Sequence, residues 1–338
     1  MIHKQTLTPV HGGDITEASA RLGRSEDGWL DLSTGINPCA YPDIAVSSKS
    51  LARLPSSGAI EGLLAAARKA YGIPPDAGLC AAPGTQAILQ ALPEIVGRAD
   101  VAVVSPTYGE HAHLWRQAGY SVSEIGSLDQ IGDAGIIVIV NPNNPDGRLT
   151  QPGELEAVRA NLAAKDGLLI VDEAFADVAP DISVASAASQ EALLVLKSFG
   201  KYFGLAGLRL GFAAGHRDLI GTLTARLGPW AVSGSAIEIG TRALADSEWV
   251  EATRARLAVS RERLDRILLS HGFHLVGGTD LYRLVRCDES HAHFQRLAEA
   301  GVLVREFPDR PGWLRFGLPG GDSEFDRLDR ALELNSAD

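Results

Sequence analysis

Residues 198–212, SFGKYFGLAGLRLGF, place one lysine in a glycine-rich loop directly after a short apolar run. The neighbours of Lys201 in the sequence include Phe199, Tyr202 and Phe203. A lone lysine is most often a solvated surface residue, but these apolar neighbours disfavour that interpretation. An ammonium group loses stability among apolar groups, so the pKa of a lysine falls there and its amine becomes a nucleophile towards aldehydes. We therefore expect Lys201 to project into a cleft and to react with a carbonyl compound.

Short runs rich in valine, isoleucine and leucine alternate with helical segments upstream of this loop. Such runs are typical of strands that are buried on both faces of a parallel sheet. The strands are expected at 101–105, 136–140, 168–171 and 193–196. The intervening helices are expected at 59–71 and 84–92. The alternation predicts an α/β fold, with a three-layer α/β/α large domain around a mainly parallel sheet.

The character of the sequence changes after about Gly234. A long helical stretch is expected over 235–270, with a break near Ser247. Strands are then expected at 280–285 and 312–316, and helices at 290–300 and 323–334. We predict three parts: an N-terminal arm that packs with the small domain (1–30), a large domain (31–235), and a smaller α+β domain (236–338).

Composition limits the classes of function. The chain has 338 residues, 45% of them hydrophobic, and a net charge of −11. A chain this acidic is not expected to bind nucleic acid by general attraction. Its three cysteines, Cys39, Cys80 and Cys287, are far apart, so neither a disulfide framework nor a metal site is expected. The N-terminus has no apolar signal region, and no apolar run is long enough to cross a membrane, so we expect a cytoplasmic protein.

Three further segments carry groups that can bind a ligand. Asp172 ends an apolar strand in VDEAF, and ligands of open α/β sheets bind at the carboxyl ends of strands. Taken alone, Asp172 is equally typical of a helix cap or a metal ligand. Residues 141–147, NPNNPDG, favour a turn. Residues 83–86, PGTQ, open a helix, whose first N–H groups attract phosphate; alone this is an ordinary helix start.

The order and spacing of these segments resemble the type I pyridoxal-5′-phosphate (PLP) enzymes. Asp172 precedes Lys201 by 29 residues (201 − 172), and the resemblance runs from about His11 to Arg315. The most similar families are the histidinol-phosphate aminotransferases and the L-threonine-O-3-phosphate decarboxylases. The resemblance implies the type I PLP-dependent transferase fold, PLP as cofactor, and a homodimer with sites near the subunit interface.

The resemblance implies a role for each matching residue. Lys201 and Asp172 are the expected catalytic residues: Lys201 forms the covalent link to the cofactor, and Asp172 pairs with its pyridinium nitrogen. Tyr108 is expected to stack on the ring, and Asn144 to donate to its phenolic oxygen. The residues expected to bind the cofactor phosphate are Gly84, Thr85, Ser198 and Arg209.

The sequence departs from the aminotransferase pattern at three positions. Phe175 stands where many relatives have a tyrosine, which removes one hydroxyl donor to the cofactor. Leu54 stands where many have a tyrosine that reaches the cofactor phosphate of a neighbouring subunit. Asp146 replaces a threonine. We expect the first change to alter the cofactor environment and the second to remove one intersubunit contact.

The substrate site is also inferred from the resemblance. Arg315 matches the arginine that binds the substrate carboxylate, and Asn37 and Asn144 are further candidates for substrate binding. His11, in His-Gly-Gly-Asp, and Arg305 match residues that in the decarboxylases lie near and bind the substrate phosphate. The alternative is a solvated Arg305 and a disordered arm around His11.

Two reactions remain open at this point. The His-Gly-Gly element favours PLP-dependent decarboxylation of L-threonine O-3-phosphate to (R)-1-amino-2-propanol O-2-phosphate in cobalamin biosynthesis. The alternative is an aminotransferase that acts on histidinol phosphate or an aromatic amino acid. A third possibility is a PLP-fold protein that only binds a ligand or partner.

The pair His111 and His113 is expected on a polar helix rather than at a metal.

Overall fold

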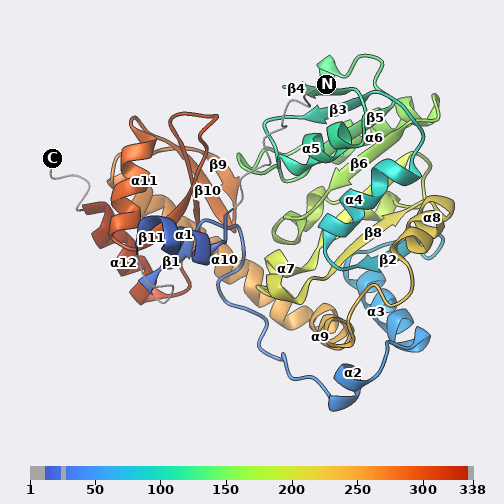
Figure 1. Ribbon diagram of the computed structural model, residues 1–338, viewed down its shortest axis with the longest axis horizontal. Coiled ribbons are helices and arrows are strands. Elements are labelled where there is room, and N and C mark those ends of the chain that lie inside the picture. Colours follow the sequence, from blue (N-terminus) through green and yellow to red (C-terminus); the bar gives the residue numbers. More distant parts are fainter. Residues whose placement is uncertain (1–11, 24–27, 334–338) are drawn as a thin grey trace. The chain divides into compact units, whose positions relative to one another are not determined.

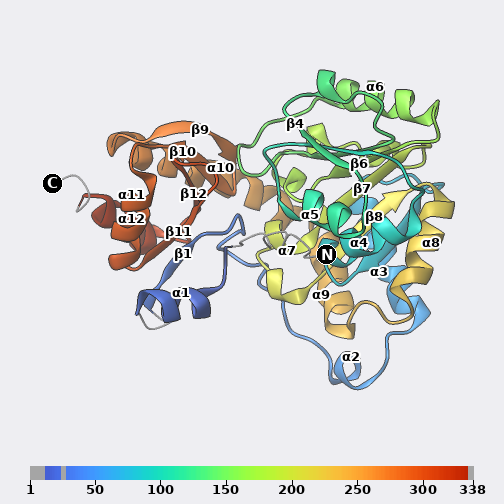
Figure 2. The ribbon, with the colours of Figure 1, turned by 45° about the horizontal axis from the view of Figure 1, so that its top comes forward.

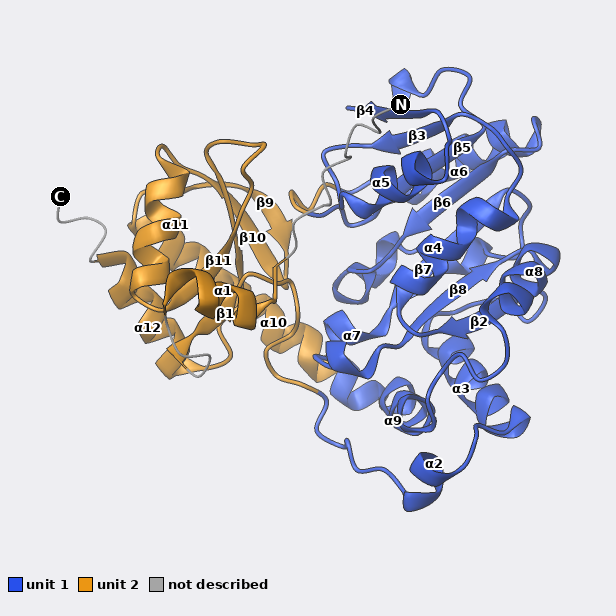
Figure 3. Cartoon of the chain, viewed as in Figure 1, with its two compact units in different colours: residues 1–9, 41–144, 149–250 blue, residues 10–40, 145–148, 251–338 orange. Residues whose placement is uncertain are grey.

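A computed structural model of the chain describes residues 12–23 and 28–333. The chain forms two compact units (Figure 3). Unit 1 includes residues 41–144 and 149–250, and unit 2 includes residues 145–148, 251–333 and the described part of 10–40. The predicted division into an arm and two domains remains a prediction; residues 31–40, which it assigns to the large domain, belong to unit 2.

Unit 1 is built on a seven-stranded sheet in the order β2-β8-β7-β6-β5-β3-β4 (Figure 1). β8 runs antiparallel to its neighbours β2 and β7, whereas the other pairs are parallel. The α/β prediction and its four strands are confirmed, with β6 and β7 extending slightly further than predicted. The strands are β2 (Gly78–Ala82), β3 (Val101–Val104), β4 (Val122–Ile125), β5 (Ile136–Val140), β6 (Leu168–Asp172), β7 (Leu193–Ser198) and β8 (Gly211–Gly215).

Helices cover both faces of this sheet, so unit 1 has three layers. The apolar residues of α4 (Thr85–Ile95), α5 (Glu110–Gln117) and α8 (Arg217–Leu227) join one buried cluster with the strands. α6 (Pro152–Ala163) lies on the other side of the sheet (Figure 2). The other helices of unit 1 are α2 (Ser48–Ala52), α3 (Ser57–Ala70), α7 (Phe199–Tyr202) and α9 (Gly234–Ala245).

The predicted helices of unit 1 are present, and their ends follow from capping residues. Ser56 caps α3 by accepting a hydrogen bond from the Ala59 amide, and Ser233 caps α9 in the same way. Short 3₁₀ turns occupy the loops at η2 (Leu128–Gln130), η3 (Ala176–Val178), η4 (Pro180–Ile182), η5 (Ala185–Ala187) and η6 (Ala206–Leu208). The loop between β6 and β7 is therefore ordered by successive turns, close to where Asp172 ends its strand.

Unit 2 contains a five-stranded sheet in the order β1-β11-β12-β10-β9. β1 and β11 are parallel and the other pairs are antiparallel. The α+β prediction for this part of the chain is confirmed. Its strands are β1 (Leu30–Leu32), β9 (His274–Thr279), β10 (Tyr282–Arg286), β11 (Val302–Glu306) and β12 (Trp313–Gly317). Besides most of α10, which is described below, its helices are α1 (Ile15–Leu22), α11 (Ser290–Glu299) and α12 (Asp322–Glu333).

The long helical stretch expected over 235–270 is present and is interrupted where predicted. α9 ends at Ala245, and α10 (Ser247–Ser270) begins two residues later. Asp246 stands between them and accepts a hydrogen bond from the Trp249 amide (3.0 Å), which is a helix-capping interaction. In residues 12–23 and 28–333, no helix is long and apolar enough to cross a membrane.

Candidate active site

Asp172, the last residue of β6, is buried in unit 1 and held by two partners. Its Oδ2 lies 3.0 Å from Nε2 of His111, and its Oδ1 accepts a hydrogen bond from the Ala174 amide (3.1 Å). His111 lies on a helix, α5, as expected, but it is 1% exposed and faces the interior of unit 1. The physical reason is that α5 turns its first residues towards the carboxyl end of β6, where Asp172 needs a hydrogen-bond donor. His111 thus fixes the carboxylate.

Lys201 lies in α7, the short helix that follows β7, and is half-buried. Its Nζ is 5.2 Å from the ring centroid of Phe175, a cation–π distance. The helix around it is anchored by apolar packing, because Phe199 and Phe203 stack at 4.3 Å and Phe203 stacks on Trp249 at 5.5 Å. These rings hold the backbone on both sides of Lys201 in place. The predicted apolar surroundings are therefore present.

Gly84 and Arg209 come together at the N-terminus of α4. A Cβ atom on Gly84 would lie 2.5 Å from Nη2 of Arg209, and Gly84 has φ +81°, so only glycine fits there. The N-cap residue of this 11-residue helix is Gly84, which has no side chain that could accept a hydrogen bond from the first N–H groups. Arg209 itself has φ 52°, a left-handed conformation that is rare for a residue with a side chain and that is found at functional sites. A guanidinium beside helix N–H groups binds a phosphate well.

Thr85 and Ser198 both lie at element ends; Thr85 opens a helix as expected, whereas the strand that Ser198 ends is two residues longer than predicted. Thr85 is the first residue of α4, and its amide packs so closely on Gly211 that a Cβ there would approach it to 2.7 Å. Ser198 ends β7 and precedes α7. Because Ser198 pairs in register with Gly211, both residues belong to the part of the sheet that carries the start of α4.

Tyr108 begins a short chain of polar contacts in unit 1. Its hydroxyl donates to Oε1 of Gln86 (3.4 Å), and Nε2 of Gln86 donates to Oε2 of the buried Glu110 (3.1 Å). Burial, followed by the nearby carboxylates of Glu110 and Asp172, raises the pKa of Tyr108 to about 12. The ring also makes an edge-to-face contact with His111, at 5.8 Å between centroids. Tyr108 is thereby fixed as a neutral phenol near Asp172.

The asparagine-rich turn after β5 is held by two of its three asparagines. Asn141 exchanges two hydrogen bonds of 2.9 Å with the backbone of Thr150. Asn143 donates to the Pro106 carbonyl (2.8 Å) and accepts from a neighbouring threonine. The turn that carries the half-buried Asn144 is therefore fixed by its own sequence.

These residues of unit 1 fit PLP. The guanidinium of Arg209 beside Gly84 and the N–H groups at the start of α4 suit a phosphate dianion. The buried carboxylate of Asp172 suits a protonated ring nitrogen, and the amine of Lys201 suits an aldehyde. The three groups supply what such a cofactor needs at its three functional ends: a cation, an anion and a nucleophile.

The departures from the aminotransferase pattern lie in different surroundings. Phe175 is 4% exposed and presents its ring to Lys201 instead of a hydroxyl. Leu54 is 66% exposed. Asp146, in unit 2, accepts a hydrogen bond from the Arg148 amide (3.0 Å) and stabilises its own turn.

Two of the predicted substrate residues lie side by side in unit 2. Arg305 of β11 and Arg315 of β12 are register partners on antiparallel strands. Arg315 is buried, stands over the Tyr282 ring at 5.1 Å, and donates to the Ser33 carbonyl (2.7 Å). Burial, to which the charge of Arg305 adds, lowers the pKa of Arg315 to about 10. Burial also lowers the pKa of Arg305.

The N-terminal glycine motif lies beside the same strands. The Gly13 amide donates to Oγ of Ser33 (2.8 Å), and a Cβ on Gly12 would lie 2.5 Å from the Ser33 carbonyl oxygen. Arg305 and Gly12 line one cavity of about 90 Å³. His11, which precedes Gly12, lies outside the described residues. Asn37 is buried and accepts a hydrogen bond from the Cys39 amide (3.0 Å).

The sequence interpretation gave no role in the site to three residues around Tyr108 and Asp172: His111, Glu110 and Gln86. One signal was available for His111, because it follows Tyr108 by three residues, and residues three apart share a face at the start of a helix. Glu110 carried no such signal, since an acidic residue in the first turn of a helix is ordinary.

Comparison with known proteins agrees with this geometry. Residues 38–333 match the family model for aminotransferase class I and II. The chain is 43% identical to a threonine-phosphate decarboxylase of Pseudomonas aeruginosa, over 95% of this chain and 96% of the relative. It is also 43% identical to one of a Sinorhizobium species, over 96% and 97% of the two chains.

Solved structures show the same fold. Histidinol-phosphate aminotransferase from Sinorhizobium meliloti, solved in complex with PLP, matches with a TM-score of 0.81 at 20% identity, over 97% of this chain and 95% of that one. L-threonine-O-3-phosphate decarboxylase from Porphyromonas gingivalis matches with a TM-score of 0.77 at 17% identity, over 91% and 99%. With the extent of the family match, these findings establish that the chain belongs to the aminotransferase class I and II family and is a PLP-dependent enzyme.

Proposed function

We propose that this enzyme decarboxylates L-threonine O-3-phosphate to (R)-1-amino-2-propanol O-2-phosphate in cobalamin biosynthesis. The observation that carries the proposal is the pair Arg305 and Arg315, two cations in register on neighbouring strands. The substrate carries two anionic groups, a carboxylate and a phosphate, whereas histidinol phosphate carries one. The names of two relatives at 43% identity support the same reaction.

Each cofactor residue has a defined task in this proposal. Bound PLP withdraws electrons from the α carbon of the substrate and weakens the bond that lies perpendicular to its ring. Asp172, fixed by His111, keeps a proton on the ring nitrogen. Lys201 binds the cofactor and holds a proton on its amine when the substrate amine has replaced it. In the overall reaction the bond from the α carbon to the carboxylate breaks, carbon dioxide leaves, and a proton takes its place.

The substrate residues orient the molecule. We assign the carboxylate to Arg315, whose guanidinium can bind two oxygens at once, and the phosphate to Arg305 with His11. The cavity lined by Arg305 and Gly12 supports the second assignment. Asn37 and Asn144 are assigned to further polar contacts with the substrate. The orientation of the substrate then decides which bond at its α carbon lies perpendicular to the ring and breaks.

The reaction is tested with the purified protein reconstituted with PLP. We expect release of carbon dioxide from L-threonine O-3-phosphate, formation of the amino alcohol phosphate, and an unchanged cofactor absorbance after turnover. The proposal fails if no carbon dioxide is released while a keto acid is converted to an amino acid, which would establish the aminotransferase alternative. Unphosphorylated L-threonine is the control for the phosphate site.

The phosphate assignment is tested by Arg305→Gln. Loss of one charge-assisted contact costs about 2 kcal/mol, so KM for the phosphorylated substrate should rise about 30-fold. The cofactor absorbance should not change. Arg286→Gln, an exposed arginine on β10 of the same sheet, is the matched control. Equal KM values for the two variants would show that Arg305 does not bind the substrate phosphate.

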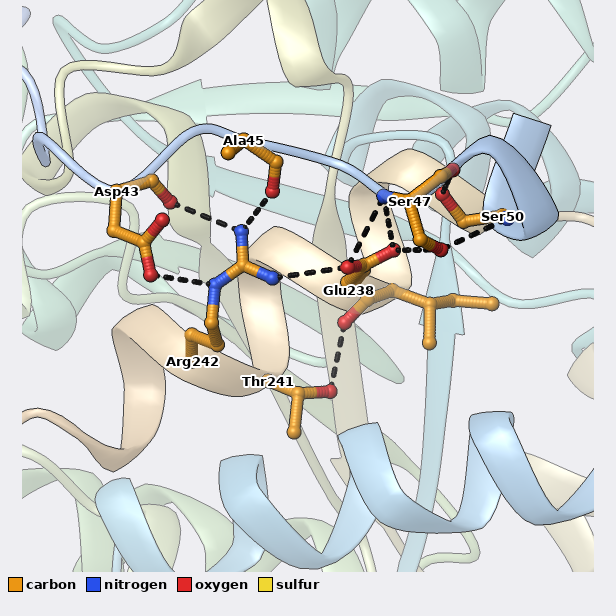
Figure 4. Close-up of polar contacts among 8 residues, drawn as sticks. Asp43, Ala45, Ser47, Ser50, Glu238, Thr241 and Arg242 are labelled. Atoms are coloured by element: carbon orange, nitrogen blue, oxygen red, sulfur yellow. Dashed lines mark hydrogen bonds and ion pairs between the residues drawn. The ribbon is translucent and has the colours of Figure 1, made fainter.

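One segment of unit 1 is held on the surface by a polar cluster (Figure 4). Arg242 of α9 forms an ion pair with Asp43 (Nε–Oδ2, 2.8 Å) and donates to the main-chain oxygens of Asp43 and Ala45. Glu238 accepts hydrogen bonds from the amide and the hydroxyl of Ser47, the latter at 3.0 Å. Residues 43–47 are thus fixed against α9 by side chains rather than by a strand or helix of their own.

We propose that this segment takes part in a homodimer. Three large apolar side chains in and after it are more than half exposed: Ile44 (55%), Leu51 (68%) and Leu54 (66%). Trp230, also in unit 1, is 57% exposed. Exposed apolar surface of this kind, where it is contiguous, is typical of protein–protein interfaces. The second copy of this chain is the occupant that the family resemblance implies.

Sedimentation at micromolar concentration tests the dimer. We expect twice the mass of the chain, and Leu51→Glu with Leu54→Glu should shift the protein towards the monomer. A wild-type monomer at this concentration would contradict the proposal. We also propose a cytoplasmic location, which fractionation of cells that produce the protein would test.

A further inference from the structure

Two buried charged residues lie next to the catalytic residues in the chain and have no task in the proposed function. Glu173 directly follows Asp172, and Lys197 precedes Lys201 by four residues. Nζ of Lys197 lies 2.5 Å from Oε2 of Glu173, and the two side chains are 4% and 0% exposed. Burying two charges is costly, so a pair at this position calls for a physical reason.

Both carboxylate oxygens of Glu173 and two of the three N–H groups of Lys197 have polar partners. Oε2 of Glu173 also accepts from the Ser183 hydroxyl (2.5 Å), and Oε1 accepts from the Val184 amide (2.7 Å). Nζ of Lys197 donates to Oγ of Ser183 (3.1 Å) and lies 5.0 Å from the ring centroid of Tyr71. A buried ion pair holds a definite geometry only when its remaining donors and acceptors are satisfied in this way.

The pair joins the two strands that carry the catalytic residues. Asp172 of β6 and Leu196 of β7 are register partners, and the Glu173 amide donates to the Leu196 carbonyl (2.9 Å). The ion pair extends this register by one residue, just beyond the end of β6 and one residue before the end of β7. It therefore ties the backbone that leads into Asp172 to the backbone that leads into Lys201.

The pair does not lie on the face that carries Asp172. Side chains alternate along a strand, so Glu173 and Lys197 point away from the face of Asp172 and its partner His111 of α5. Lys197 contacts Tyr71, which follows α3, and pairs in register with Phe212 of β8. The pair can therefore act on the cofactor residues only through the backbone.

We propose that the Glu173–Lys197 ion pair is a positioning device that sets the placement of Asp172 relative to Lys201. The inference rests on the use of PLP in the proposed function and deepens it. Asp172 and Lys201 bind opposite ends of one rigid ring, so a change in their separation weakens cofactor binding and alters the electrostatic surroundings of the lysine-bound cofactor. A pair that served stability alone would not have this effect.

The test compares charge removal with charge retention. Glu173→Gln and Lys197→Met each leave one buried charge without its partner, the double variant removes both charges, and Lys197→Arg retains the cation. Three quantities are measured without substrate: the melting temperature of the apoprotein, its dissociation constant for PLP, and the pH midpoint of the visible absorbance of the bound cofactor.

We expect both single variants to lower the melting temperature and the double variant to recover most of that loss, because no unpaired charge remains. If the pair positions the site, the double variant should still bind PLP about 10-fold more weakly, as for other residues that orient ligand-binding groups. Its pH midpoint should be shifted by about half a unit or more. Lys197→Arg should stay near the wild type.

The proposal is overturned if the double variant has the wild-type dissociation constant and pH midpoint. Should that variant not fold, Ser183→Ala removes one hydrogen bond from the pair and keeps both charges; a wild-type midpoint there also overturns the proposal. Since none of these measurements uses substrate, a wild type that binds PLP at Lys201 but releases no carbon dioxide refutes the proposed function alone.

Discussion

The charged groups at the strand ends of unit 1 and those of the β11–β12 pair of unit 2 are arranged in opposite ways. In unit 1, Asp172 meets His111 and Glu173 meets Lys197, so each of these two carboxylates has a basic partner. In unit 2, Arg305 and Arg315 are like charges in register, and each is desolvated. The first arrangement suits a cofactor that stays in place, and the second suits an anionic ligand that binds and leaves.

The difference predicts how each region responds to mutation. A change among the balanced groups of unit 1 should disturb the cofactor and show in its spectrum. A change among the arginines of unit 2 should weaken substrate binding and leave the spectrum unchanged. Single substitutions in each region show whether the two can be separated in this way.

Lys201→Ala should have the largest effect. Without the amine no covalent link to PLP forms, and decarboxylation should fall by more than about 10³-fold. Borohydride treatment of the wild type followed by peptide mass analysis should place the label on Lys201. The exposed Lys165→Ala is the control. A label on any other lysine would show that Lys201 is not the residue that binds the cofactor covalently.

Arg315→Lys should have the next largest effect. A lysine keeps the charge but loses the two-point contact with a carboxylate, which costs about 2–4 kcal/mol, so kcat/KM should fall by about 30- to 1000-fold. The absorbance of the bound cofactor should stay as in the wild type. A changed spectrum with intact substrate affinity would show that Arg315 serves the cofactor, and the contrast between the units would fail.

His111→Phe should have a smaller effect, of about 10-fold on kcat. The ring fills the same space but no longer donates to Asp172, and a hydrogen bond to a charged group contributes about 1.5–3 kcal/mol. Nδ1 of His111 has no hydrogen-bond partner among the described residues, so only the bond to Asp172 is removed. The pH dependence of the cofactor spectrum should differ between this variant and the wild type. Gln117→Ala, exposed on the same helix, is the control; identical profiles for the two variants would refute a role for His111.

The sequence predicted the fold well because several of its strands are continuous apolar runs that are easily recognised. Ile136–Val140 is a continuous apolar run, which fits a strand buried on both faces, and the structure shows such a strand. The cofactor candidates were also visible, because each lies in a short motif whose residues stay together when the chain folds. Gly84 and Arg209 come from separate motifs, yet their contact follows once both sit at the ends of neighbouring elements.

The partners behind those candidates could not be read from the sequence. Glu173 and Lys197 are charged residues of ordinary appearance, and a single charge carries no periodicity that shows whether it is buried. His111 looked polar for the same reason. The register of Arg305 with Arg315 depends on which strands of unit 2 pair, and the sequence did not predict strand β11 at all. Pairing between distant segments is a tertiary property.

The smallest expected effect concerns Tyr108 and appears only at high pH. Its pKa is raised to about 12 in the folded protein, from about 10 in an unfolded chain. The unfolded state therefore loses this proton first, and the stability gained from the neutral phenol, complete below pH 10, declines as the pH rises to 12. Tyr108→Phe has no such proton. Between pH 9 and 11.5 the unfolding free energy of the wild type, measured in urea, should fall by about 1–2 kcal/mol more than that of the variant. Parallel curves would show that the phenol is not buried beside the carboxylates of unit 1.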